Sequence, residues 1–130
     1  MNRAPSTGRV AFVGSGPGDP GLLTVRARDA IASAPLIVTD PDVPEAILAL
    51  AAEGAEVRPA VGQPADVARD LVAEARAGRT VTRLVSGDPL TVDAVVAEAL
   101  AVSGAEVAFD VVPGVPSGTG IMVMANARVM

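Results

Sequence analysis

The sequence predicts an α/β fold in which helices flank a parallel sheet of five strands. Five short β-like runs alternate with four helical windows, at a repeat of about 25 residues that is typical of β-α units. Half of the residues are hydrophobic, yet the chain has no Trp or Tyr and only two Phe. A core of Ala, Val, Leu and Ile suits strands buried on both faces, as in parallel sheets covered by helices.

The expected strands are short and separated by helical segments. They are Arg9–Val13, Leu36–Thr39, Glu56–Val61, Thr80–Val85 and Glu106–Val112. Pro59 removes a ladder donor from the third strand, so we expect that strand at an edge of the sheet or with an irregularity. Right-handed crossovers through the helices should join the strands.

The helical windows show one-sided apolar patterns. The stripe of the first window consists of Leu23, Ala27, Ala30, Ile31 and Ala34. The stripe of the last window consists of Val92, Val95, Val96, Ala99 and Leu100. Glycine stands just past three windows, at Gly54, Gly78 and Gly104. Because the residue just past a helix end commonly turns left-handed, we expect a positive φ at each.

With 130 residues the chain is the size of one domain. We expect a disordered tail over 1–8, the domain over 9–118, and a divergent or truncated end over 119–130. A net charge of −5 and scattered arginines argue against nucleic-acid binding. Apolar stretches are far shorter than the roughly 20 residues of a membrane span, and neither a signal peptide nor Cys is present. We therefore expect a soluble, cytoplasmic protein without a membrane partner.

Gly, Pro, Asp and Ser are concentrated in the loops that follow the expected strands. These loops read GSGPGDPG, DPDVP, GQP, SGDPLT and PGVPSG. In an open α/β sheet the loops at the carboxyl ends of the strands line one crevice, where ligands bind. The sequence therefore predicts a ligand site at this edge.

The first loop passes the dinucleotide-binding pattern and yet disfavours a phosphate. Gly16–Gly21 satisfies G-x-G-x-x-G, and Asp40 follows at about the spacing of a ribose-binding acid. A pyrophosphate needs backbone N–H groups and a positive helix end, but Pro17 and Pro20 carry no N–H and Asp19 adds negative charge. In the plainer interpretation, Asp19 only caps the first helix and the glycines only turn the chain.

The Gly-Asp-Pro motif of the first loop recurs after the fourth strand, in Ser86-Gly87-Asp88-Pro89. Taken alone, Asp88 fits a helix cap or an Asx turn. Two such turns on neighbouring strand ends offer carbonyls and carboxylates, which suit a neutral or cationic ligand.

Asp40 is the best acid/base candidate. The chain has no His, Cys, Tyr or Lys, so proton transfer near neutral pH falls to Asp and Glu, and metal sites built on His or Cys are excluded. Asp40 directly follows LIVT at the rim of the sheet. The alternative is a cap for a helix starting near Pro44, and spacing alone does not separate the two roles.

Four pieces of the chain resemble the tetrapyrrole (corrin/porphyrin) methylases, and within them the uroporphyrinogen-III C-methyltransferases. They are VGSGPGDPGLLTVRA (Val13–Ala27), IVTDPDVPEAI (Ile37–Ile47), VTRLVSGDPL (Val81–Leu90) and VVPGVPSG (Val111–Gly118). The resemblance implies the N-terminal domain of the tetrapyrrole methylase fold. Within the family, the chain is most similar to the methyltransferase half of bifunctional proteins that also carry uroporphyrinogen-III synthase.

The resemblance also implies S-adenosyl-L-methionine as cofactor and a tetrapyrrole as substrate, with uroporphyrinogen III converted to precorrin-2 for sirohaem and cobalamin. The positions that match cofactor contacts are Pro17, Ser86, Gly87, Asp88, Thr91, Pro116 and Ser117. Asp40 matches the proton acceptor. S-adenosylmethionine is a sulfonium cation without phosphate, which agrees with the chemistry of the first loop.

Three departures from the family pattern are visible. A lysine expected after the third strand is absent, with Gln63 at or next to its place, and Pro116 replaces a threonine. The family's enzymes are also about twice as long, with a second α/β domain. We therefore expect a domain that is weakly active or inactive by itself.

Four other interpretations stay open. Two are other members of the superfamily, either a precorrin methylase or an RNA-directed relative. Another is a non-catalytic binding module or homodimerisation module with an uncovered apolar face. A dinucleotide-binding fragment is the least favoured, because of the prolines.

Overall fold

The structure is a computed structural model that describes residues 8–116. The expected tail up to residue 7, the expected divergent end over 119–130 and Ser117 lie outside the described residues. Within 8–116, no helix is long and apolar enough to cross a membrane.

The described chain forms one five-stranded parallel sheet, as predicted. Its strands are β1 (Arg9–Gly14), β2 (Leu36–Thr39), β3 (Glu56–Pro59), β4 (Thr80–Val85) and β5 (Phe109–Val112). The strand order is β3-β2-β4-β1-β5, and every neighbouring pair is parallel. The third strand lies at an edge of the sheet and ends at Pro59, as expected for a residue without a backbone N–H to donate.

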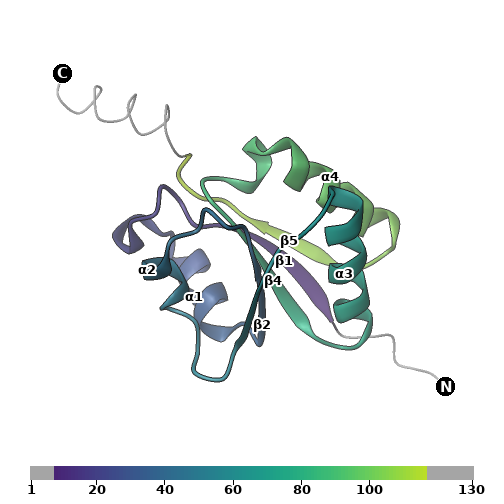
Figure 1. Ribbon diagram of the computed structural model, residues 1–130, viewed down its shortest axis with the longest axis horizontal. Helices are drawn as coiled ribbons and strands as arrows, with labels where there is room; N and C mark the ends of the chain where they lie inside the picture. The colour runs from purple at the N-terminus through teal and green to yellow at the C-terminus, as the bar shows by residue number, and fades with distance from the viewer. Residues whose placement is uncertain (1–7, 117–130) are drawn as a thin grey trace.

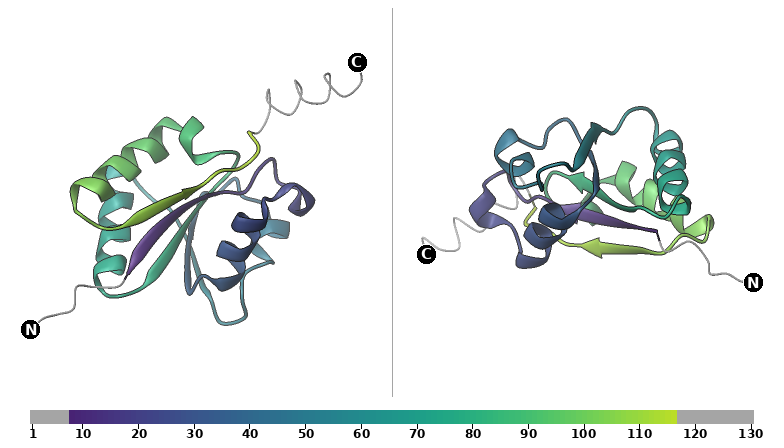
Figure 2. Two further views of the ribbon diagram at one scale, coloured as in Figure 1. Left: turned by 180° about the vertical axis from the view of Figure 1, so that it is seen from behind. Right: turned by 90° about the horizontal axis from the view of Figure 1, so that it is seen from below.

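Helices cover both faces of the sheet (Figures 1 and 2). They are α1 (Val25–Ser33), α2 (Glu45–Leu48), α3 (Pro64–Arg76) and α4 (Asp93–Gly104), with 3₁₀ turns η1 (Pro20–Leu22) and η2 (Pro89–Thr91). The chain moves in one direction from β1 through β2 to β3 and returns through β4 to β5. Because crossovers are right-handed, the outward helices α1 and α2 lie on one face and the returning helices α3 and α4 on the other.

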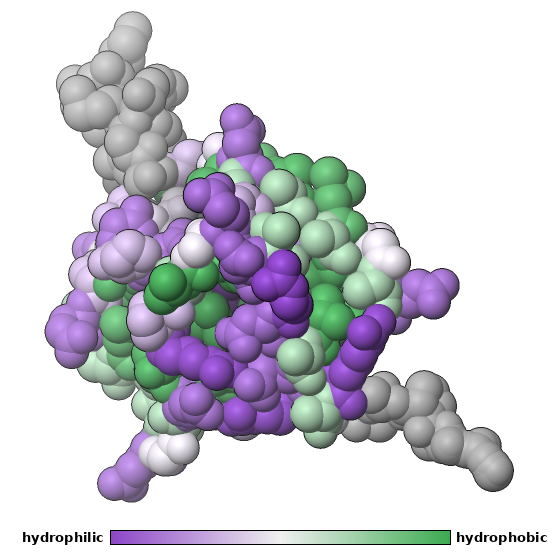
Figure 3. All heavy atoms as spheres, turned by 45° about the vertical axis from the view of Figure 1, so that its right-hand side comes forward, coloured by the Kyte–Doolittle hydropathy of each residue, from purple (hydrophilic) through white to green (hydrophobic). Residues whose placement is uncertain are grey.

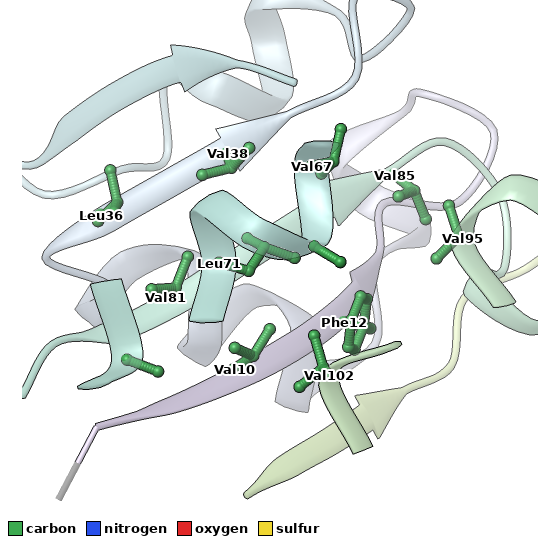
Figure 4. Packing of buried hydrophobic residues seen from close by; sticks show 12 residues of the cluster. Val10, Phe12, Leu36, Val38, Val67, Leu71, Val81, Val85, Val95 and Val102 are labelled. Carbon is green, nitrogen blue, oxygen red and sulfur yellow. The ribbon is translucent and has the colours of Figure 1, made fainter. Parts of the chain in front are cut away.

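Two hydrophobic clusters hold these layers together, one on each face of the sheet. The cluster under α3 and α4 includes Phe12, Leu71, Val95 and Val102 (Figure 4). Phe12 contacts Phe109 edge to face, with ring centroids 5.9 Å apart. These two rings are all the aromatic side chains of the protein, so aliphatic packing dominates the core as predicted.

The first predicted helical stripe is confirmed, whereas the last one is partly wrong. Ala27, Ile31 and Ala34 are buried in the cluster beneath α1 and α2. On α4, however, Leu100 is 69% exposed and Glu98 is only 2% exposed. Leu100 lies about 200° around the helix from Glu98, so burial of Glu98 turns Leu100 to solvent.

The turn from α4 into β5 also differs from the prediction. Gly54 and Gly78 have positive φ (88° and 97°) as expected, but at this turn Glu106 has φ 62°. Gly104 remains in α4, and the Glu106 N–H donates to the Ser103 carbonyl (3.0 Å). The left-handed residue therefore falls two positions after Gly104, and β5 starts at Phe109 instead of Glu106.

Replacing Glu106 with glycine is expected to stabilise the protein by about 0.5–1 kcal/mol, because glycine adopts positive φ without a Cβ clash. Glu106 is exposed, so little packing is lost. Glu53→Gly is the matched control, because Glu53 is exposed and does not have positive φ, and it should destabilise. Chemical denaturation measures both effects. Equal destabilisation by the two variants would contradict the strained turn.

A network of ion pairs joins β3, α3 and the start of β4. Arg58 hydrogen-bonds to Glu74 and lies 3.6 Å from Asp70, while Arg79 contacts Glu74 (3.3 Å) and Glu56 (3.2 Å). The hydrogen bond from Arg58 is the main reason that the pKa of Glu74 is lowered. That bond likewise raises the pKa of Arg58.

The lowered pKa of Glu74 gives a pH-dependent contribution to stability. That contribution is fully present above the unfolded glutamate pKa of about 4.3, and it is lost as the pH falls through the lower folded-state pKa. Glu74→Gln removes the contribution, which we expect to be about 1 kcal/mol or less in this partly exposed network. The difference in unfolding free energy between wild type and variant should therefore shrink from about pH 6 to about pH 3. A constant difference, measured by urea denaturation at each pH, would refute the assignment.

Candidate functional site

The candidate site lies where β1, β4 and β5 end. β1 and β4 are neighbours, but the loop after β1 leads to α1 on one face and the loop after β4 leads to α4 on the other. Adjacent parallel strands whose loops part in this way leave a crevice at their carboxyl ends, the usual ligand position in such sheets. The topology thus brings the loops after β1, β4 and β5 together at the predicted edge of the sheet.

The two Gly-Asp-Pro loops are joined backbone to backbone. The Gly16 N–H donates to the Gly87 carbonyl (3.2 Å), and the Gly87 N–H donates to the Gly16 carbonyl (2.9 Å). Both residues have positive φ, 68° and 72°, which glycine adopts without strain. The repeated motif is therefore one structural unit, built from two strand ends.

The loop after β5 packs against the same junction. The Gly114 N–H donates to Asp88 Oδ1 (3.3 Å). A Cβ added to either Gly14 or Gly114 would lie 2.3 Å from the Gly87 carbonyl oxygen. Three backbone segments thus pass one another at a distance that only glycine permits.

Asp88 therefore ties two loops together, and it makes no capping bond to η2. Thr91 Oγ1 donates to the Asp88 carbonyl (2.8 Å). Pro17 and Ser86 are half-buried and Pro116 is exposed. The structure brings the predicted cofactor residues of the first two loops to one edge, and Pro116 ends the described part of the third loop.

The first loop has few free donors for a phosphate. The N–H groups of Ser15, Gly16 and Gly21 are bound to Val85, Gly87 and Asp19. Pro17 and Pro20 have no N–H, so Gly18 and Asp19 hold the loop's remaining backbone donors within the described chain. Asp19 caps η1, and Thr24 rather than Asp19 caps α1. These contacts strengthen the prediction that the loop disfavours an anion.

Asp40 lies at the same edge, at the end of β2, and is held by a buried arginine. Arg83 Nη2 donates to Asp40 Oδ1 (2.7 Å). The alternative role as a helix cap is wrong, because Pro44 is the N-cap of α2 and no side chain caps that end. Asp40 therefore does not cap a helix, and Arg83 orients its side chain.

Arg83 and Glu98 form a buried ion pair that the sequence analysis missed. Their side chains are each 3% exposed, and Arg83 Nε donates to Glu98 Oε1 (2.7 Å). Burial by itself would lower the pKa of Arg83, but the hydrogen bonds and charges of Glu98 and Asp40 outweigh it and raise that pKa. The sequence did carry a signal: an arginine within the otherwise uncharged strand TVTRLV requires a partner in the core.

A cavity of about 130 Å³ opens beside this pair. Among its lining residues are Asp40, Gly62, Arg83, Val92 and Glu98. It lies between the N-terminal ends of α3 and α4, where Gln63, the residue at or next to the expected lysine's place, is the N-cap of α3. Residues 8–116 contain no group of three or more acidic side chains placed to hold a metal ion.

A model of the family described as Tetrapyrrole (Corrin/Porphyrin) Methylases matches residues 9–129. The chain belongs to the tetrapyrrole methylases. The parallel sheet, the glycine loops at its carboxyl edge and the sequence motifs all agree with this membership.

Relatives of this tetrapyrrole methylase include methyltransferases of two kinds. It is 43% identical over 129 residues to a uroporphyrinogen-III C-methyltransferase of Sinorhizobium sp, covering 94% of this chain and 46% of that protein. It is 42% identical over 112 residues to a precorrin-4 C(11)-methyltransferase of Rhodococcus erythropolis, covering 85% and 45%. The chain thus spans about half the length of these relatives.

Solved structures show the same fold. The crystal structure of uroporphyrin-III-C-methyltransferase from Thermus thermophilus matches with a TM-score of 0.84 at 38% identity, covering 92% of this chain and 53% of that one. A second crystal structure of the Thermus thermophilus enzyme, complexed with S-adenosyl homocysteine, matches with a TM-score of 0.77 at 39% identity, covering 83% and 48%.

An apolar groove lies between α3 and α4. The groove has a volume of about 260 Å³ and is lined by Ala65, Ala68, Arg69, Val72, Ala101 and Ala105. In Figure 3 the right-hand side of Figure 1, which carries α3, comes forward. Hydrophobic residues (green) lie there among hydrophilic ones (purple).

Proposed function

We propose that this tetrapyrrole methylase domain forms the cofactor-binding half of an S-adenosylmethionine-dependent methyltransferase that acts on uroporphyrinogen III. The observation that carries the proposal is the pair of Gly-Asp-Pro loops bonded through Gly16 and Gly87. Glycines allow a ligand close to the backbone there, while prolines and carboxylates disfavour a phosphate. The Sinorhizobium and Thermus relatives support the same reaction class.

The residues at this edge fit the cofactor. Asp19 and Asp88 place negative charge near the two loops, which suits a cation, and Ser15 Oγ is buried without a hydrogen-bond partner among the described residues. In our proposal the cofactor contacts come from Pro17, Ser86, Gly87, Asp88, Thr91, Pro116 and Ser117. When bound, S-adenosylmethionine supplies an electrophilic methyl group on its sulfonium sulfur.

Asp40 is the proposed proton acceptor. Transfer of a methyl group from the sulfonium to a pyrrole-ring carbon leaves the substrate with a positive charge. The substrate then loses a proton from another position, and a positioned carboxylate assists that loss. Asp40 is half-buried, lines the 130 Å³ cavity and is fixed by Arg83. The chain has no lysine, so in our proposal the lysine expected near Gln63 takes no part.

In our proposal, catalytic turnover requires a second part of the protein besides this chain. The chain spans about half of its relatives, so we propose that it is their N-terminal domain, that it supplies the cofactor loops and Asp40, and that the remainder completes the substrate site. A small-molecule tetrapyrrole as the substrate, a cytoplasmic location and the lack of nucleic-acid partners belong to the same proposal, supported by the net charge of −5. Whether the domain forms a homodimer is decided by sedimentation analysis.

The test uses an extended version, in which the chain is joined to the part of the Sinorhizobium methyltransferase that it does not match. With uroporphyrinogen III and labelled S-adenosylmethionine, we expect two methyl groups to be transferred in succession. Methylation of a precorrin instead would favour the second candidate, a precorrin methylase, which the Rhodococcus relative supports. Lack of transfer to either substrate would contradict an enzymatic role and favour a binding module.

A further inference from the structure

The buried pair of Arg83 and Glu98 has a feature that stability alone does not require. Charged residues are costly to bury, and apolar residues of similar size often stabilise a core equally well. Here the pair reaches a third charged group, the carboxylate of Asp40, at the carboxyl edge of the sheet. Asp40 is the only one of the three whose side chain is substantially exposed, at 24% against 3% for each of the other two.

The guanidinium group of Arg83 is fixed on every side. Nε and Nη2 donate to the two oxygens of Glu98 at 2.7 and 3.0 Å, in a fork. Nη1 donates to the Leu84 carbonyl (3.2 Å) and lies 3.5 Å from the Val38 carbonyl. The two bonds to Glu98 therefore fix the plane of the guanidinium group without any contribution from Asp40.

Asp40 is in turn held at its backbone and at one carboxylate oxygen. Its N–H donates to the Leu84 carbonyl (3.0 Å), and its carbonyl accepts from the Val43 N–H (3.3 Å). Oδ1 accepts from Arg83 Nη2 at 2.7 Å, whereas Oδ2 accepts no hydrogen bond from residues 8–116. One oxygen is thus anchored while the other is available at a residue that lines the cavity.

We propose that Arg83, locked by Glu98, is a positioning residue that orients the carboxylate of Asp40 for proton acceptance. This inference rests on the proposed function, in which Asp40 is the acceptor. The side chain of Arg83 is only 3% exposed and its Nη2 donates to Asp40, so in this proposal it acts through Asp40. Glu98 acts one step further away, by fixing the guanidinium group and balancing its charge.

The test is the double variant Arg83→Met/Glu98→Leu in the extended version. It replaces both buried charges with apolar side chains, so the fold should be retained, as circular dichroism and thermal unfolding would show. We expect kcat to fall about 10- to 100-fold, because the acceptor loses its fixed orientation. The KM for S-adenosylmethionine should stay within about twofold. Arg9→Met is the matched control, since Arg9 pairs with Asp110 on the surface, and it should leave kcat unchanged.

A second measurement separates positioning from a merely structural role. On an Asp40→Asn background, the double variant should cause no further loss of kcat, because its effect passes through Asp40. An equal loss on both backgrounds, or no loss in wild type, would overturn the proposal. If the wild-type extended version transfers no methyl group, the proposed function fails instead.

The 130-residue chain allows a readout that needs no activity. Three-bond scalar couplings report the χ1 rotamer of Asp40 by NMR. We expect one rotamer in the wild type and in Arg9→Met, and averaged rotamers in the double variant. A single unchanged rotamer in the double variant would show that Arg83 does not orient Asp40.

Discussion

Gly14→Ala is expected to lower the free energy of unfolding by at least about 2 kcal/mol, because it overpacks a closed backbone junction. The new Cβ would lie 2.3 Å from the Gly87 carbonyl oxygen and 2.9 Å from the Gly114 nitrogen. Both atoms belong to backbone at strand ends, so they cannot turn away as a side chain could. The loops must separate, which should also weaken binding of S-adenosylhomocysteine by at least about tenfold.

Gly104→Ala provides the control for this prediction. It makes the same chemical change at a glycine in α4 where φ is not positive and where an added Cβ would meet nothing within 4 Å outside the backbone of its own helix. Alanine in a helix should stabilise by about 0.5–1 kcal/mol. Urea denaturation and calorimetry with S-adenosylhomocysteine measure both variants. If Gly14→Ala binds and unfolds like Gly104→Ala, the three loops do not form the close junction described above.

Glu98→Ala is expected to lower the free energy of unfolding by about 3–5 kcal/mol, because it leaves a buried arginine without its main partner. Arg83 would keep Asp40 and two backbone carbonyls, but it would lose both bonds of the fork. Asp40 is 24% exposed at the rim and cannot replace Glu98, whose side chain on α4 is 3% exposed. The cost should far exceed that of removing an exposed carboxylate.

Glu53→Ala tests that comparison, since Glu53 is exposed and lies in a turn. Its effect should stay within about 0.5 kcal/mol. Denaturant unfolding of both variants at neutral pH gives the two values. A cost for Glu98→Ala as small as that for Glu53→Ala would mean that Arg83 finds other partners, and it would remove the basis for the positioning role.

The glycine and proline loops were the most predictable part of the site. Proline without an N–H and glycine with positive φ act locally, so GSGPGDPG and SGDP already indicated a close backbone approach without a phosphate. What the sequence could not show is that Gly16 bonds to Gly87 and that Gly114 bonds to Asp88. Those contacts depend on the order of β1, β4 and β5 in the sheet, and strand order is a long-range property.

The wrong prediction for α4 has a similar physical origin. An apolar stripe ending in Leu100 fits helix periodicity, and a charged residue such as Glu98 is normally assigned to solvent. The partner that reverses this assignment, Arg83, is 15 positions away in the sequence and sits on a different element. Only the placement of α4 over the sheet brings the two charges together, and Arg83 links them to Asp40.

Isothermal titration calorimetry with S-adenosylhomocysteine tests the central claim most directly. It would be run on the 130-residue chain and on the extended version, with NAD titrated into both in parallel. We expect S-adenosylhomocysteine to bind the extended version and, more weakly, the chain itself, and NAD to bind neither. Binding of NAD, or no binding of S-adenosylhomocysteine to either protein, would contradict the assignment of the Gly16 and Gly87 loops as an S-adenosylmethionine site.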